Sequence, residues 1–378
     1  MEPFEIHFPD AVLEDLQRRL SETRWPTQIG SGWEYGADLS YLKELCEYWR
    51  TGFDWRAQEK ALNRFDHFKT AIDDLTIHFI HQRSDNPKAL PLVIIHGWPG
   101  SICEFGKIIG PLSDPTHHGG QAQDAFHVVC ISMPGFGFSD PPGKPGFDIK
   151  TVAEVVAKLM ARLGYSTYGA QGGDWGSSVA SWLGSIDEEH VCGIHLNLVA
   201  VSPPKGMRDP LEGLSQREIA HLERRRTFMK YEVGYREIQS TKPLTLSYGL
   251  NDSPAGLAAW IVDLFRSWSD CAGDIEHTFT KDELLSNITV YWATQTIDAS
   301  MRVYYETRKS KNFYPQCVNV PTGCAIFPEE ILNVPRQWAE NIYNIKRWTE
   351  MPFGGHFAAL EAPDLLVEDI RAFFRHLR

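Results

Sequence analysis

Hydrophobic and polar residues follow a helical pattern at the start of the chain. Apolar side chains recur at helical spacing in residues 10–20 and again in residues 39–49. Residues 74–81 then alternate apolar with polar side chains, as in a strand. We therefore predict a helical extension over residues 1–70, packed on a core that begins at residue 71.

Apolar runs that end in turn residues come next, and they alternate with helical segments. Residues 90–95 stop before Gly-Trp-Pro-Gly, residues 126–131 stop shortly before Pro-Gly, and residues 191–199 form a third run. An amphipathic helix is predicted over residues 151–164, whereas residues 166–171 are hardly apolar although the alternation requires a strand there. Strand–helix alternation of this kind is typical of a parallel α/β sheet.

The pattern changes between residues 202 and 316, where strand signals disappear and helical spacing dominates. Alternation of strands and helices returns at residue 317 and ends in a C-terminal helix. A helical block that interrupts an α/β chain indicates a lid inserted into a catalytic domain. The catalytic domain would then comprise residues 71–201 and 317–378, with residues 202–316 as the lid.

Composition narrows the class of protein. The chain has 378 residues, of which 43% are hydrophobic and 23% are charged, enough for one large core with an inserted domain. The net charge of −12 and the lack of a long basic run argue against nucleic acid and anionic membranes as partners. The acidic, amphipathic N-terminus predicts no leader peptide and no membrane anchor. The seven scattered cysteines predict reduced thiols in the cytoplasm, without disulfides or a metal site.

One pentapeptide, Gly172-Gly173-Asp174-Trp175-Gly176, has the spacing of a nucleophile elbow with a carboxylate at its centre. The glycines allow a strained turn from strand to helix, and the N-terminus of the following helix stabilises an anion. Asp174 is therefore either a carboxylate nucleophile or simply the cap of that helix.

Further motifs stand in the order that a hydrolase with such an elbow needs. The HGWPG loop after the first apolar run and the residue after the nucleophile make the backbone N–H groups of Trp98 and Trp175 candidates for an oxyanion hole. His356 lies in a loop before the last helix, where a catalytic base is expected, and Glu329 or Glu330 follows the preceding strand as its acid. Each of these residues also has a non-catalytic interpretation: the histidine could cap a helix, and the two acids could lie in a solvated first turn.

The sequence closely resembles the microsomal-type epoxide hydrolases, which include the juvenile-hormone epoxide hydrolases. The resemblance runs almost end to end, through HGWPG, GGDWG, FPEE, GGH and the N-terminal segment WRTGFDWRAQEKALNRFDHFKT, which other α/β-hydrolases lack. It implies an α/β-hydrolase fold: a mostly parallel central sheet, an N-terminal helical extension around the core and an inserted helical lid over the site.

The resemblance also implies catalytic roles, which are carried by Asp174 as nucleophile, His356 as the base that activates water, Glu330 as the acid that orients the histidine, and Tyr235 and Tyr304 as lid donors to the epoxide oxygen. The adjacent Tyr305 and Glu329 leave two of these positions open by sequence logic alone.

The expected reaction is the hydrolysis of a small apolar epoxide to a diol, with water as co-substrate and no cofactor. A homodimer is compatible with the sequence. A haloalkane dehalogenase would share the aspartate, the acid and the histidine, but it needs halide-binding N–H groups in place of two phenols. A ligand-binding protein of the same fold without catalysis is the alternative from another class.

Overall fold

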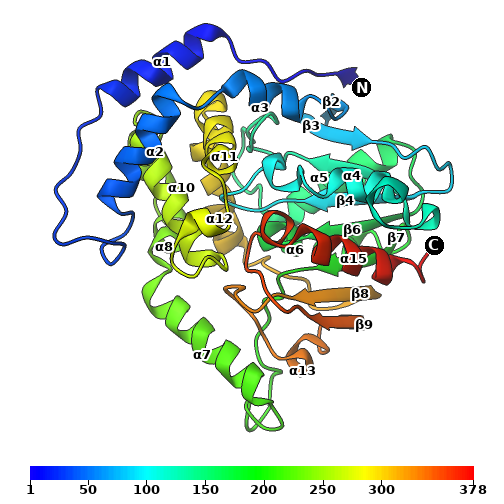
Figure 1. Ribbon diagram of the computed structural model, residues 1–378. Helices are drawn as coiled ribbons and strands as arrows, with labels where there is room; N and C mark the ends of the chain where they lie inside the picture. The colour runs from blue at the N-terminus through cyan, green and yellow to red at the C-terminus, as the bar shows by residue number, and fades with distance from the viewer.

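The computed structural model describes residues 1–378, and its centre is a nine-stranded sheet in the order β1-β2-β3-β5-β4-β6-β7-β8-β9 (Figure 1). The parallel part of the sheet consists of β4 (Leu90–Ile95), β5 (Phe126–Ile131), β6 (Tyr168–Gly172), β7 (Val191–Leu196), β8 (Val318–Ile326) and β9 (Tyr343–Glu350). The predicted apolar runs are almost wholly buried as β4, β5 and β7, as expected for strands covered on both faces.

Antiparallel strands extend one edge of the sheet: β1 (Glu2–Pro3), β2 (His67–Ile72) and β3 (Leu75–Gln82). The strand predicted at 74–81 is β3, but β2 lies partly in the region expected to be helical. Its buried positions include His67 and Thr70, so no apolar alternation marks it in the sequence. The predicted boundary at residue 70 therefore cuts a hairpin, and the sheet begins at β1.

Helices cover the two faces of the sheet with separate hydrophobic clusters. Val93 and Ile95 of β4 belong to the cluster that includes α5 (Ile149–Arg162) and α6 (Asp174–Ile186). Leu92 and Ile94 belong to the cluster of α4 (Ile109–Ser113) and α15 (Pro363–Phe374). The remaining short helices are η1 (Ile102–Phe105), η2 (Pro115–His118), η3 (Ala122–Asp124), α13 (Arg336–Ala339) and α14 (Ala358–Glu361). Alternate residues of one strand thus serve two layers, as the pleat of a strand dictates.

Most of the lid helices stand together beside the sheet, whereas α7 extends away from them toward α13 and the β9 edge (Figure 1). They are α7 (Gln216–Tyr231), α8 (Gly234–Gln239), α9 (Pro243–Leu250), α10 (Pro254–Trp268), η4 (Ile275–His277), α11 (Lys281–Thr294) and α12 (Ile297–Ser310). All of them fall between residues 202 and 316. Among the helices of the chain, none combines the length and the apolar character that crossing a bilayer requires.

The N-terminal helices are α1 (Asp10–Ser21), α2 (Leu39–Thr51) and α3 (Trp55–Leu62). Helices α1 and α2 pack against α10 of the lid. The indole of Trp49 donates to Thr289 Oγ1 at 3.0 Å, and the Tyr48 hydroxyl donates to Asp282 at 2.8 Å. The extension therefore holds the lid as well as the core.

Candidate active site

Asp174 stands at the turn between β6 and α6, at the carboxyl end of the parallel strands. Its backbone has φ = 47°, a left-handed conformation that costs energy in any residue except glycine. A Cβ on Gly176 would lie 2.0 Å from the carbonyl oxygen of Ile95, and a Cβ on Gly172 would lie 2.2 Å from that of Gly176. Glycine is needed at 176 because the turn passes so close to β4, and at 172 because the turn folds back on its own backbone. The strained turn presents the carboxylate of Asp174 away from the sheet, as a nucleophile elbow does.

The two residues of the predicted oxyanion hole lie next to this carboxylate, and one of them donates to it. The N–H of Trp98 donates to Asp174 Oδ1 at 2.8 Å. Trp175 lies in the first turn of α6, where the N–H groups have no partner within the helix. The structure thus brings both residues of the predicted oxyanion hole to Asp174.

His356 and Glu330 complete a linear array with Asp174. His356 Nε2 lies 3.4 Å from Asp174 Oδ2, and His356 Nδ1 lies 2.8 Å from Glu330 Oε1. The side chain of Glu330 is fully buried and also accepts the Ile331 N–H. Glu329 points elsewhere: its side chain is 37% exposed and pairs with Arg224 of α7. Of the two candidate acids, only Glu330 contacts the histidine.

Electrostatics favour the protonated form of His356 while Asp174 is free. Burial alone would lower the pKa of the imidazole, but the negative charges of Glu330 and Asp174 outweigh it and raise the pKa well above its ordinary value. Glu330 and Asp174 therefore favour a proton on the imidazole before the reaction begins.

Two lid tyrosines face this array from above Trp98 and Trp175. Tyr235 of α8 stacks on the Trp98 ring at 5.7 Å, and Tyr304 of α12 meets the Trp175 ring edge-on at 4.8 Å. The two phenol rings are 6.0 Å apart. Tyr305, in contrast, lies under the ammonium group of Lys309 and is only half-buried. The structure therefore brings Tyr304, and not Tyr305, to the site.

Both phenols remain protonated in this environment. Burial raises the pKa of Tyr235 and of Tyr304, and the negative charge of Asp174 raises both further. They are neutral hydrogen-bond donors opposite a carboxylate.

Glu104 of η1 is a further acid at the site, and no sequence motif marks it. Together with Asp174 and His356 it borders a cavity of about 20 Å³, which is room for a single water molecule. Burial raises the pKa of Glu104 to about 8, with His356 opposing and Asp174 reinforcing the shift. A lone glutamate in a short turn has no spacing signature, so only the fold could reveal it.

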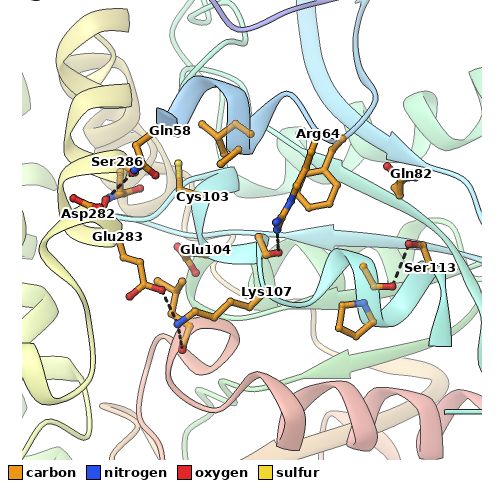
Figure 2. Close-up of a pocket in the computed structure, with 18 of the residues that line it drawn as sticks. Gln58, Arg64, Gln82, Cys103, Glu104, Lys107, Ser113, Asp282, Glu283 and Ser286 are labelled. Atoms are coloured by element: carbon orange, nitrogen blue, oxygen red, sulfur yellow. Dashed lines mark hydrogen bonds and ion pairs between the residues drawn. The ribbon is translucent and has the colours of Figure 1, made fainter. Parts of the chain in front are cut away.

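Glu104 also borders a larger cavity, of about 760 Å³ (Figure 2). Residues of α3, η1, α4 and α11 line it. Lys107 and Glu283 form an ion pair of 2.6 Å in its wall, and Lys107 also donates to the carbonyl of Leu360. Glu104 therefore lines both the large cavity and the small one beside the catalytic groups.

Comparisons with known families agree with this geometry. Residues 1–105 match the family described as "Epoxide hydrolase N terminus", and residues 91–217 match "alpha/beta hydrolase fold". The chain is 41% identical to epoxide hydrolase 1 of Sus scrofa, over 98% of this chain and 88% of that protein.

The fold is also similar to solved structures of epoxide hydrolases. The juvenile hormone epoxide hydrolase of the silkworm Bombyx mori superimposes with a TM-score of 0.93 at 32% identity, covering 100% of this chain and 94% of that one. The epoxide hydrolase of Aspergillus niger has a TM-score of 0.89 at 32% identity, covering 100% of this chain and 96% of that one.

Proposed function

Because the chain belongs to the epoxide hydrolase family, we propose that it converts apolar epoxides to vicinal diols through an ester on Asp174. One observation carries the proposal: Asp174 lies between a histidine–acid pair of the core and two phenols of the lid. An epoxide carbon needs in-line attack from one side while an acid holds the ring oxygen on the other. The site offers both groups in facing positions.

Ring opening uses Asp174 and the tyrosines. The carboxylate attacks a ring carbon, the C–O bond breaks, and Tyr235 or Tyr304 gives its proton to the departing oxygen. Since the charge of Asp174 helps to raise the pKa of both phenols, its loss on ester formation makes them stronger acids. The site thus supplies its best acid when the alkoxide develops.

The same loss of charge prepares His356 for the second step. Ester formation removes one of the two carboxylates that hold a proton on the imidazole, so its pKa falls. Glu330 remains bonded to Nδ1 and keeps the ring oriented. The imidazolium proton passes to the tyrosinate that ring opening left, which restores the neutral phenol. The neutral imidazole then takes a proton from water.

The cavity beside Asp174, His356 and Glu104 is large enough for one water molecule, and we assign the hydrolytic water to it. Hydroxide attacks the ester carbonyl of Asp174, and the N–H groups of Trp98 and Trp175 stabilise the oxyanion, each by about 3 kcal/mol. Collapse of this intermediate breaks the bond to the diol, whose oxygen takes the remaining proton of the attacking water, and leaves the Asp174 carboxylate beside a protonated His356. Water is the only co-substrate in this scheme, which uses no metal and no cofactor. All of the groups come from one chain, so the chemistry needs no partner subunit.

Two phenols over the nucleophile favour this reaction over that of a haloalkane dehalogenase. A departing halide needs N–H donors and no proton, whereas an alkoxide needs a proton donor. Halide release from a chlorinated alkane, without diol formation from epoxides, would reverse the choice. A protein that only bound a ligand would not need the contacts that join Asp174, His356 and Glu330.

A single-turnover experiment tests the proposal. Wild type incubated with styrene oxide should form diol, and Asp174→Ala should form none, while the exposed Asp85→Ala should behave as wild type. Enzyme whose carboxylates carry ¹⁸O should pass one labelled oxygen into the first diol, because hydrolysis cleaves the ester at the Asp174 carbonyl. Diol formation by Asp174→Ala would exclude the ester.

A further inference from the structure

The loop that carries His356 is bonded directly to the lid. The His356 N–H donates to the carbonyl oxygen of Trp268, the last residue of α10, at 3.0 Å. Two residues earlier, the Gly354 N–H donates to Asp270 Oδ2 at 2.9 Å. The Trp268 ring also packs edge-on against the imidazole at 4.9 Å. The backbone of the catalytic histidine therefore rests on lid residues, and not only on the core.

Glu361, at the end of α14, also connects the loop that carries His356 to the lid residues that follow α10. Its Oε1 accepts the Phe357 N–H at 2.7 Å, and its Oε2 accepts the Asp270 N–H at 2.8 Å. A Cβ on Gly355 would lie 2.8 Å from Trp268 O and 3.0 Å from Glu361 Oε2. The loop can come this close to the lid only because residue 355 is glycine.

We propose that Glu361 is a positioning residue for the second half-reaction: by bonding both Asp270 and Phe357, it makes the place and the basicity of His356 depend on the seated lid. This inference rests on the proposed function. The Phe357 N–H belongs to the residue next to His356, so a shift at Glu361 moves the imidazole directly. The ring-opening groups Asp174, Tyr235 and Tyr304 make no hydrogen bond to Glu361.

Charge supports the same role. Burial raises the pKa of Glu361 to about 7, although the N–H groups of Asp270 and Phe357 and the charge of His356 oppose the shift. Above that pH the carboxylate accepts two charge-assisted hydrogen bonds, and below it one oxygen becomes a donor that faces an N–H group. The two hydrogen bonds that Glu361 accepts from Asp270 and Phe357 are therefore both present when its carboxyl group is ionised, and they are weakened in acid.

Several ionisable groups act on Glu361 from the surrounding elements. His356 and Asp270 are the nearest, Lys107 donates to the neighbouring Leu360 carbonyl, and the guanidinium of Arg224 in α7 senses the charge of Glu361. Beyond the imidazole lie Glu330, Asp174 and Glu104. Among the acids, Glu361 is the one that bonds both the lid backbone and the histidine loop.

Glu361→Gln tests the inference, because it keeps the shape but loses the charge and one acceptor oxygen. Ester formation should proceed as in wild type, seen as an enzyme adduct by rapid-quench intact mass. Ester hydrolysis should slow by about tenfold, since small misplacements of catalytic groups have effects of this size. The acid limb of the hydrolysis rate should also move to lower pH, because a negative charge that raises the pKa of His356 has been removed.

The matched control is Glu368→Gln on α15, whose side chain is 63% exposed; it removes the same charge without touching the loop. Unchanged hydrolysis and an unchanged acid limb in Glu361→Gln would overturn the inference, as would an equal effect in Glu368→Gln. If wild type forms no adduct at all, the proposed function itself fails.

Asp270→Asn provides a second test should Glu361→Gln unfold. It weakens the bond to Gly354 and leaves Glu361 in place, so ester hydrolysis should slow while ester formation is retained. Equal loss of both steps would indicate a general structural role and overturn the inference.

Discussion

The core side and the lid side of the active site differ in charge and in how they hold their catalytic groups. On the core side, Asp174, His356 and Glu330 follow the ends of strands, and the histidine contacts both carboxyl groups. On the lid side, Tyr235 and Tyr304 come from helices and are neutral rings packed on tryptophans.

This difference assigns the two sides to different steps. A neutral phenol can give a proton to an alkoxide, but it cannot activate water at neutral pH, because burial holds its pKa high. His356, oriented by Glu330, can activate water once Asp174 is esterified. Variants of the two sides should therefore impair different half-reactions, and the variants below test that separation.

His356→Gln should have the largest effect. Glutamine cannot take a proton from water, so the enzyme should open one epoxide and then stop. Intact mass should show an adduct of the substrate's mass that persists for the length of the experiment. Continued diol formation would mean that another group is the base.

Glu330→Gln should slow ester hydrolysis by about 10⁴-fold, since a neutral partner permits the wrong imidazole tautomer. Glu329→Gln is its matched control and should retain turnover, because the carboxylate of Glu329 contacts only the half-exposed Arg224. Comparable losses in both variants would undo the assignment of the acid. Steady-state diol formation is sufficient to measure them.

Tyr235→Phe combined with Tyr304→Phe should slow ester formation by about 10²–10⁴-fold, the usual range for proton assistance. Hydrolysis of ester already formed should keep its rate, because the phenols act on the alkoxide and not on the water. Tyr305→Phe serves as the control and should react normally. Loss of the hydrolytic step in the double variant would show that the two sides are not separate.

Glu104→Gln should have the smallest effect and should change a pH profile. With a pKa of about 8, Glu104 is neutral at pH 7 and gains a negative charge as the pH rises through 8. That charge repels the hydroxide and the oxyanion, so hydrolysis in wild type should slow above pH 8. Glutamine stays neutral, and the decline should disappear, as single-turnover decay of the ester between pH 6 and 10 would reveal.

The sequence predicted those strands whose hydrophobic pattern matches their burial in the folded protein. Apolar runs identified β4, β5 and β7 because both of their faces are buried. β6 has no such run: its YGAQG is wholly buried, but small residues make room for neighbours such as Phe374, whose ring would lie 2.4 Å from a Cβ on Gly169. Only its place in the alternation predicted it.

The site was predictable where motif and chain order constrain it. Asp174 and His356 follow from their motifs. Two adjacent identical residues look the same in a sequence, although their side chains point in different directions. Only the packing therefore distinguishes Glu330 from Glu329 and Tyr304 from Tyr305. Glu104 and Glu361 were missed for another reason. Each acts through its distance to residues far away in the chain, and neither has a sequence spacing that reports such a distance.

The attachment of α2 to the lid has a consequence for building chimaeras. The bonds from Trp49 to Thr289 and from Tyr48 to Asp282 cross an interface between segments more than 200 residues apart in the printed sequence. A lid transplanted from a relative would arrive without the surface on which it rests. Residues 1–62 and 216–310 therefore form one unit of exchange, and new substrate specificity is best introduced by moving both segments together.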